Sequence, residues 1–111
     1  MTPAQALDMY RRQMSKHGED VIVRRRANGV ITAEVTTRAR VVGYEPREIV
    51  GAVIAGDRKV IALVDSLSSL LPVSTLDKIV VRGRECAIKA VDDNTRRVAG
   101  TLIALELQVA G

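Results

Sequence analysis

The last third of the chain constrains the fold most, because it predicts three consecutive antiparallel strands together with their turns. Gly83 accepts a positive φ between two β-rich segments, which predicts a tight hairpin joining Ile79–Arg82 to Glu85–Val91. The side chains of Asp92-Asp93-Asn94 can hydrogen-bond to their own backbone, which favours a second turn. A third strand, Val98–Val109, is then expected to be the longest in the chain.

The two faces of this final strand differ in character. Alternation with a period of two puts branched aliphatic side chains on one face and small or polar ones on the other. The apolar face holds Ile103, Leu105, Leu107 and Val109, and the opposite face holds Ala104, Glu106 and Gln108. We therefore expect a central strand with one face in the core and the other near water or a partner.

The composition favours one mainly β domain spanning residues 1–111. Hydrophobic residues make up 47% of the chain but aromatic residues only 2%, so the core must be built from Val, Ile, Leu and Ala, which suit strands. No alternation of strands and helices is visible. We expect a small antiparallel β-barrel or sandwich over residues 19–111, preceded by one helix within residues 1–18.

The N-terminal helix is predicted to span Pro3–His17. Thr2 can cap it, with Gln5 completing a capping box, and Gly18 marks its end. A narrow apolar stripe at helical spacing consists of Leu7, Tyr10 and Met14. Such a helix needs the sheet or a neighbouring subunit to lie against.

Alternating residues predict further strands between the helix and the terminal unit. Asn28-Gly29 is the strongest hairpin signal and follows the strand Val21–Arg26. The other expected strands are Val30–Glu34, Val35–Val42 and Arg58–Val64, and a helical turn is expected at Asp65–Leu71, before Pro72.

A long loop, residues 43–57, is the predicted partner-binding element, because loops of that length inside a compact domain are usually functional or disordered. A plug at the end of the barrel or a short extra hairpin is an equally open alternative. The candidate partner-binding residues in and beside this loop are Tyr44, Ile49, Val50, Val53, Ile54 and Arg58.

Arg24 and Arg26 are two further candidates, because alternation along a strand places them on one face. They could contact a phosphate or an acidic partner, or they could protect a solvated edge strand from aggregation. The net charge of +4 allows contact with nucleic acid or an acidic protein surface. The scarcity of aromatic residues argues against a stacking platform for single strands.

No catalytic, metal or cofactor site is expected. His17, the only histidine, is expected at the C-terminal end of the helix, where its favourable charge interaction with the helix dipole is sufficient explanation for a histidine. Asp92 and Asp93 are better explained as turn-forming residues. Cys86 is the only cysteine and is expected to be a small buried apolar residue. No apolar segment has the length of a membrane span or the form of a signal sequence, so we expect a chain that is intracellular when made and has no membrane partner.

Two segments resemble small head-tail joining proteins, also called head-completion or stopper proteins, of tailed phages, prophages and gene transfer agents. The first runs from Gly43-Tyr44-Glu45-Pro46 to Gly51, and the second is Gly56-Asp57-Arg58-Lys59-Val60-Ile61. The terminal pattern, from Asp77 through Arg82-Gly83-Arg84 to the final strand, is similar too. The resemblance covers nearly the whole chain.

This resemblance implies a β-barrel or sandwich with a mobile loop and no enzyme activity. It implies a connector subunit that forms a homo-oligomeric ring in the virion neck, between the portal or adaptor protein and a tail protein, with DNA passing through the channel. Such a subunit would lie in the cytoplasm of the host or producer cell before assembly. A nucleic-acid-binding small barrel and a tail-completion or terminator protein of the same particle are the alternatives.

The predicted loop generates a test of assembly. Replacing Ile49 and Val53 together by serine should leave the monomer folded by circular dichroism, because neither residue belongs to a strand with regular alternation. Particles made with this variant should leak DNA or fail to take tails. Normal titres of tailed particles in a producer lacking the wild-type chain would remove these residues from the assembly surface.

Overall fold

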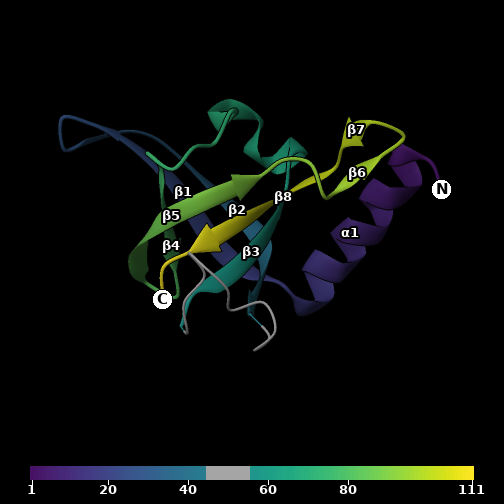
Figure 1. Ribbon diagram of the computed structural model, residues 1–111, viewed down its shortest axis with the longest axis horizontal. Helices are drawn as coiled ribbons and strands as arrows, with labels where there is room; N and C mark the ends of the chain where they lie inside the picture. Colours follow the sequence, from purple (N-terminus) through teal and green to yellow (C-terminus); the bar gives the residue numbers. More distant parts are fainter. Residues whose placement is uncertain (45–55) are drawn as a thin grey trace.

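The computed structural model describes residues 1–44 and 56–111, which form a closed antiparallel barrel of six strands with one helix outside it (Figure 1). The strands run in the order β1-β2-β3-β8-β5-β4 around the barrel. Their bounds are β1 Glu19–Ala27, β2 Val30–Gly43, β3 Arg58–Leu63, β4 Lys78–Val81, β5 Arg84–Asp92 and β8 Ala104–Val109. The expectation of a mainly β barrel with one N-terminal helix is confirmed.

The predicted long final strand is interrupted, and this prediction was wrong. Two short strands, β6 Arg97–Val98 and β7 Thr101–Leu102, form a separate ribbon before β8 begins. Ala99 and Gly100 both have positive φ, 50° and 79°, so the chain turns sharply there instead of extending. The longest strand is β2, where the two predicted strands Val30–Glu34 and Val35–Val42 are continuous.

The barrel core is aliphatic, as the composition predicted. It gathers the inward side chains of all six strands and two leucines from the 3-10 helix η2, Asp65–Leu70, which lies across one end. Its fully buried large residues include Val21, Val23, Val60, Leu67, Leu70, Ile79, Val81, Leu107 and Val109. Cys86 is buried with them, as expected.

The opposite face of β8, expected near water or a partner, is largely covered by the chain itself. Ala104 is fully buried there in a second apolar cluster beneath the helix. The prediction that Ile103 shares the core face of Leu105 was wrong, because Ile103 precedes β8 and packs in this second cluster. The side chain of Glu106 is only 13% exposed and lies 3.7 Å from Lys59 Nζ. Arg96 Nε lies 3.3 Å from Glu106 as an ion pair without hydrogen-bond alignment. β8 is therefore packed on both faces.

The helix α1, Pro3–His17, lies against the outside of β2 and β3, so the sheet is the support it needed. The predicted capping box is present, with Gln5 N–H donating to Thr2 Oγ1 and Thr2 N–H donating to Gln5 Oε1. The helix ends at Gly18, whose backbone is extended, and a glycine fits there because a Cβ would lie 2.4 Å from the Met14 carbonyl oxygen. The contact face includes Ala6, which the stripe had omitted, as well as Leu7, Tyr10 and Met14.

A buried ion pair fixes the segment that follows η2. Arg25 donates two hydrogen bonds to Asp77, at 2.9 and 3.1 Å, and its NH2 also donates to the Leu70 and Pro72 carbonyls. Asp77 is 1% exposed and also accepts from Ser74 N–H. Burial raises the pKa of Asp77, but the bonds from Arg25 and Ser74 outweigh it and hold the pKa below its ordinary value. Because Arg25 belongs to β1, these bonds hold the segment after η2 against that strand.

No helix within residues 1–44 and 56–111 combines the length and the apolar character needed to cross a membrane.

Two leucines allow a matched test of the core assignment. Leu107→Ala should lower the free energy of unfolding by about 2–5 kcal/mol, because this side chain is fully buried in β8. Leu76→Ala removes the same atoms from a side chain that is 85% exposed and should change stability by less than about 0.5 kcal/mol. Urea midpoints measure both. Equal shifts would contradict the inward placement of Leu107.

Candidate partner-binding surfaces

The predicted partner-binding residues lie in two separate places. Arg24 pairs with Glu34 in the β1–β2 ladder, whereas Arg58 pairs with Gly43, nine positions further along β2. At about 3.3 Å per residue, these points are roughly 30 Å apart. They cannot form one contact patch. Ile49, Val50, Val53 and Ile54 lie outside the described residues.

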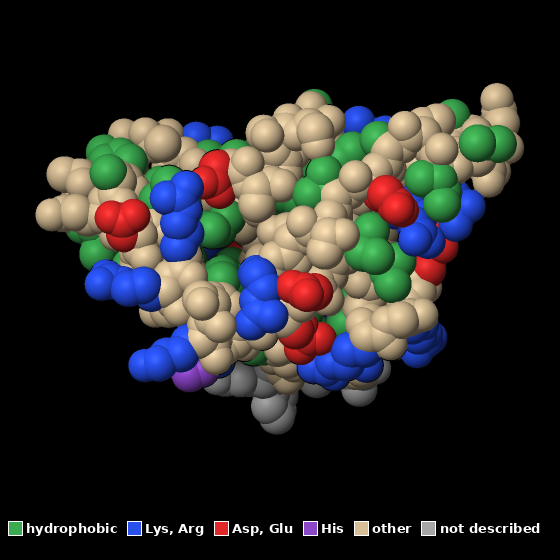
Figure 2. Space-filling view, turned by 180° about the vertical axis from the view of Figure 1, so that it is seen from behind, with side chains coloured by type: hydrophobic (Ala, Val, Ile, Leu, Met, Phe, Trp, Pro, Cys, Tyr) green, Lys and Arg blue, Asp and Glu red, His purple; other side chains and the backbone are tan. Residues whose placement is uncertain are grey.

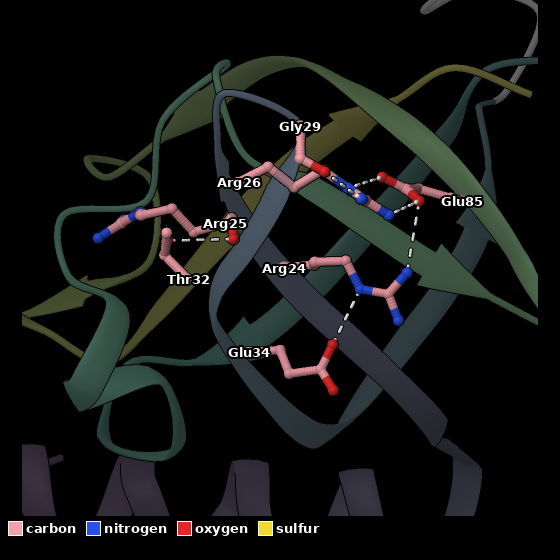
Figure 3. A network of polar contacts seen from close by, with 7 residues as sticks. All are labelled: Arg24, Arg25, Arg26, Gly29, Thr32, Glu34 and Glu85. Atoms are coloured by element: carbon pink, nitrogen blue, oxygen red, sulfur yellow. Dashed lines mark hydrogen bonds and ion pairs between the residues drawn. The ribbon is translucent and has the colours of Figure 1, made fainter.

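Arg24 and Arg26 do share a face, as predicted, but acidic side chains of the same chain hold them (Figure 3). Glu85 of β5 accepts from Arg26 Nε at 3.2 Å and NH2 at 3.0 Å, and lies 3.4 Å from Arg24 NH1. Arg24 Nε donates to Glu34 at 2.9 Å. The view also shows Arg25 pointing the other way, toward the η2 side.

This network has an electrostatic signature in the acidic residue at its centre. Hydrogen bonds from Arg26, followed by the charges of Arg26 and Arg24, hold the pKa of Glu85 below its usual value. The hydrogen bond to Glu34 raises the pKa of Arg24. Two of the predicted phosphate-binding cations are thus already neutralised within the fold.

The alternative explanation of Arg24–Arg26 as an edge strand holds only for the end of β1. β1 pairs with β2 along its whole length and with β4 through Val21–Arg24, so Arg24 lies inside the closed barrel, whereas Arg25 and Arg26 pair with β2 alone. The arginines connect β1 both to its hairpin partner β2, through Glu34, and to the distant strand β5, through Glu85. Figure 2 shows the same tendency on the back of the molecule, where Lys and Arg side chains are scattered with Asp and Glu side chains between several of them.

Tyr44 and Arg58 line a hollow of about 330 Å³ at the other end of the barrel. Lys59 Nζ lies 5.3 Å from the centre of the Tyr44 ring, within the range of a cation–π contact. The buried carboxylate of Asp57, beside Arg58, accepts from Lys89 Nζ at 2.8 Å and from Gln108 at 3.1 Å. These two predicted residues therefore belong to one site, at the end of the barrel where β2 stops and β3 starts.

A further hollow is one that the sequence did not indicate. This helix–strand groove, about 620 Å³, lies between α1, β2 and the end of β3, and is lined by Arg11, Met14, Ser15, Thr36, Thr37, Arg38, Leu63 and Ser66. The signal available in the sequence was a mismatch in length. Alternation continues from Val30 to Val42, whereas the expected strand Arg58–Val64 is only about half as long. A strand of that length can pair with only part of β2.

The tip of the β1–β2 hairpin is a second feature that sequence analysis passed over. Asn28 and Gly29 adopt the positive φ values of the predicted turn, 52° and 78°. Beyond them Val30 is 65% and Ile31 43% exposed, and Figure 1 shows this hairpin projecting from the barrel on the side away from α1. Exposed branched aliphatic residues at a projecting tip suit contact with another molecule.

The described residues hold no group of three or more His, Cys, Asp or Glu side chains that could bind a metal ion. Asp92 forms its predicted turn, accepting from the N–H groups of Asn94 and Thr95. The Thr95 hydroxyl bond, followed by these backbone bonds, lowers the pKa of Asp92. His17 is exposed in the last turn of α1.

The Glu85 network predicts a measurable change in titration. Replacing Arg24 and Arg26 together by glutamine should raise the pKa of Glu85 toward its ordinary value of 4.5, because both charges that stabilise its carboxylate are removed. NMR titration of the carboxyl carbons measures this. Asp92 is the internal control, since Thr95 and backbone groups are the main cause of its lowered pKa. An unchanged Glu85 titration would contradict the network.

Comparisons were made with protein-family models, with curated proteins and with solved structures. No family model matches the chain, and no curated protein or solved structure matches it significantly.

Proposed function

We propose that this chain is a structural connector subunit that forms a ring between the portal or adaptor of a DNA-filled head and the tail of a phage or gene transfer agent. The observation that carries the proposal is the agreement between the resembling segments and the barrel. Gly43-Tyr44 and Gly56-Asp57-Arg58, the described ends of those segments, meet at one end of the closed barrel that the resemblance implies.

The distribution of contact features also supports this role. A ring subunit between two neighbours needs separate surfaces for its own copies and for each partner. The described residues offer the hollow at Tyr44 and Arg58, the projecting tip at Val30 and Ile31, and the helix–strand groove. These lie on different parts of the barrel, as stacked contacts in a particle neck would require.

The nucleic-acid-binding alternative has less support in the geometry. That alternative depends on the segment Arg24–Arg26. Its three guanidinium groups donate hydrogen bonds to Glu34, Glu85 and Asp77 of the same chain. Binding of phosphate there would have to compete with these carboxylates.

Electron microscopy of particles tests the proposal. A producer that lacks this chain should yield DNA-filled heads without tails, and supplying the chain in trans should restore tailed particles with added density in the neck. If the exposed Leu76 contributes to a contact in the particle, the Leu76→Ala variant should restore fewer tailed particles than the wild-type chain. Normal tailed particles in the complete absence of the chain would overturn the connector role.

Salt dependence separates the nucleic-acid-binding alternative. The affinity of a DNA-binding module for duplex DNA falls steeply with salt, with a logarithmic slope near the number of phosphates contacted. The connector proposal predicts that the isolated chain binds duplex DNA weakly at physiological salt. Tight, steeply salt-dependent binding by the monomer would favour the alternative.

A further inference from the structure

The β1–β2 hairpin extends beyond the barrel as a two-stranded arm, residues 26–32. β4 pairs with β1 only as far as Arg24, and β3 pairs with β2 only from Ala39 onwards, so neither neighbouring strand reaches the arm. Every residue of the arm is exposed, and its aliphatic residues Val30 and Ile31 lie outside both apolar clusters. A two-stranded ribbon is marginally stable on its own in water. The arm therefore presents apolar side chains that its own chain does not use.

An apolar hollow of about 370 Å³, which we call the leucine hollow, lies between the segment after η2, the end of β5 and β7. Its lining residues are Leu71, Pro72, Val73, Val91, Asp93, Leu102 and Leu105. Leu71 is 39% exposed, so the hollow is open to solvent. A cavity of about 150 Å³ lined by aliphatic and aromatic residues holds a benzene molecule. The leucine hollow therefore has room for two branched aliphatic side chains.

The arm does not fill the leucine hollow of its own chain. Arg25, at the base of the arm, donates to the Pro72 carbonyl, and from there the arm continues away from the barrel (Figure 1). β7, which contributes Leu102 to the hollow, lies on the other side, beside the start of α1. No residue of the arm lines the hollow. Its occupant must come from another molecule.

The charges of the two features are complementary. The arm contains Arg26 and no acidic residue, and the Arg26 side chain remains 37% exposed although it is paired with Glu85. Asp93 is the one charged residue among those that line the hollow, and it is exposed. Its carboxylate has no ion pair in the described parts of the chain, because Arg97 donates to its backbone carbonyl instead. An arm that enters the hollow would bring a guanidinium group toward this carboxylate.

We propose that the arm of one copy of this chain inserts Val30 and Ile31 into the leucine hollow of the next copy, with Arg26 beside Asp93. The contact joins two different surfaces, so it is heterologous, and its repetition generates a ring when the rotation between copies closes. Burial of apolar side chains that are otherwise exposed to water drives the association. This inference rests on the proposed ring and names the residues that join its subunits.

Variants of the intact chain test each half of the contact. Val30→Asp combined with Ile31→Asp, the arm variant, leaves the hollow intact, whereas Leu71→Asp, the hollow variant, leaves the arm intact. Asp93→Arg is a second hollow variant, which would repel Arg26. All of these side chains are exposed, so the variants should fold, and circular dichroism checks this. Sedimentation should show that the wild-type chain associates with rising concentration and that each variant associates at least about tenfold more weakly.

A mixture of the arm variant and the hollow variant gives the sharpest result. Each variant retains one intact half of the contact, so an equimolar mixture should form dimers of one arm variant and one hollow variant and stop there. Adding the unlabelled hollow variant to the labelled arm variant should shift the methyl signals of Val73, Val91 and Leu102. Leu76→Asp is the matched control, because it places the same charge on a leucine that is 85% exposed and outside the hollow. It should associate like the wild-type chain.

Several outcomes would overturn the proposal. A wild-type chain that stays monomeric, association that neither half of the contact affects, or equal weakening by Leu76→Asp would each exclude an arm in the leucine hollow. A mixture of arm and hollow variants that stays monomeric would indicate a two-fold contact between like surfaces instead.

The particle experiment fails separately from this one. Tailless heads from a producer without the chain, together with no association through the arm, would retain the connector role and reject this contact. Normal tailed particles without the chain, together with association through the arm, would retain the contact and reject the connector role.

Discussion

The barrel depends on one six-residue strand that closes it. β8 pairs with β3 on one side and with β5 on the other, so the last strand joins the middle of the chain to the terminal hairpin. Its inward residues Leu105, Leu107 and Val109 are buried in the aliphatic core. Closure satisfies backbone groups that an open sheet would expose, and a core without Phe or Trp requires that close packing. The interruption at Ala99-Gly100 leaves Ile103 and Ala104 free to pack beneath α1.

Arginine side chains add connections to those of the strand ladders. Arg25 fastens the segment after η2 through Asp77, and Arg38 donates to the carbonyls at the end of α1. Arg24 and Arg26 connect β1 to Glu34 and Glu85. The guanidinium group suits this work, because it presents several donors in a fixed plane and stays charged. A basic composition is therefore a poor guide to binding here, since much of the charge serves the fold.

The strands of the barrel differ in length, so some of their residues pair on one side only. β2 has fourteen residues and β3 six, so the outer ladder ends while the β1–β2 hairpin continues. Natural proteins usually protect such an edge with charge, bulges or a covering element. Here η2 packs against part of that edge, with Thr37 Oγ1 2.7 Å from Ser66 Oγ, and a groove remains between β2 and α1.

The sequence by itself determined the elements whose signals are local. The capping box at Thr2 and Gln5, the positive-φ turns at Asn28-Gly29 and Arg82-Gly83, and the alternation of Leu105, Leu107 and Val109 each depend on neighbouring residues, and each was predicted correctly. The tertiary structure decided what depends on distant residues. Arg24 is 61 residues and Arg26 is 59 residues from Glu85 in the sequence. β3 pairs with only the last five residues of β2, from Ala39 to Gly43. Ion pairing and strand pairing between remote segments follow from the closed topology, which no short window of sequence contains.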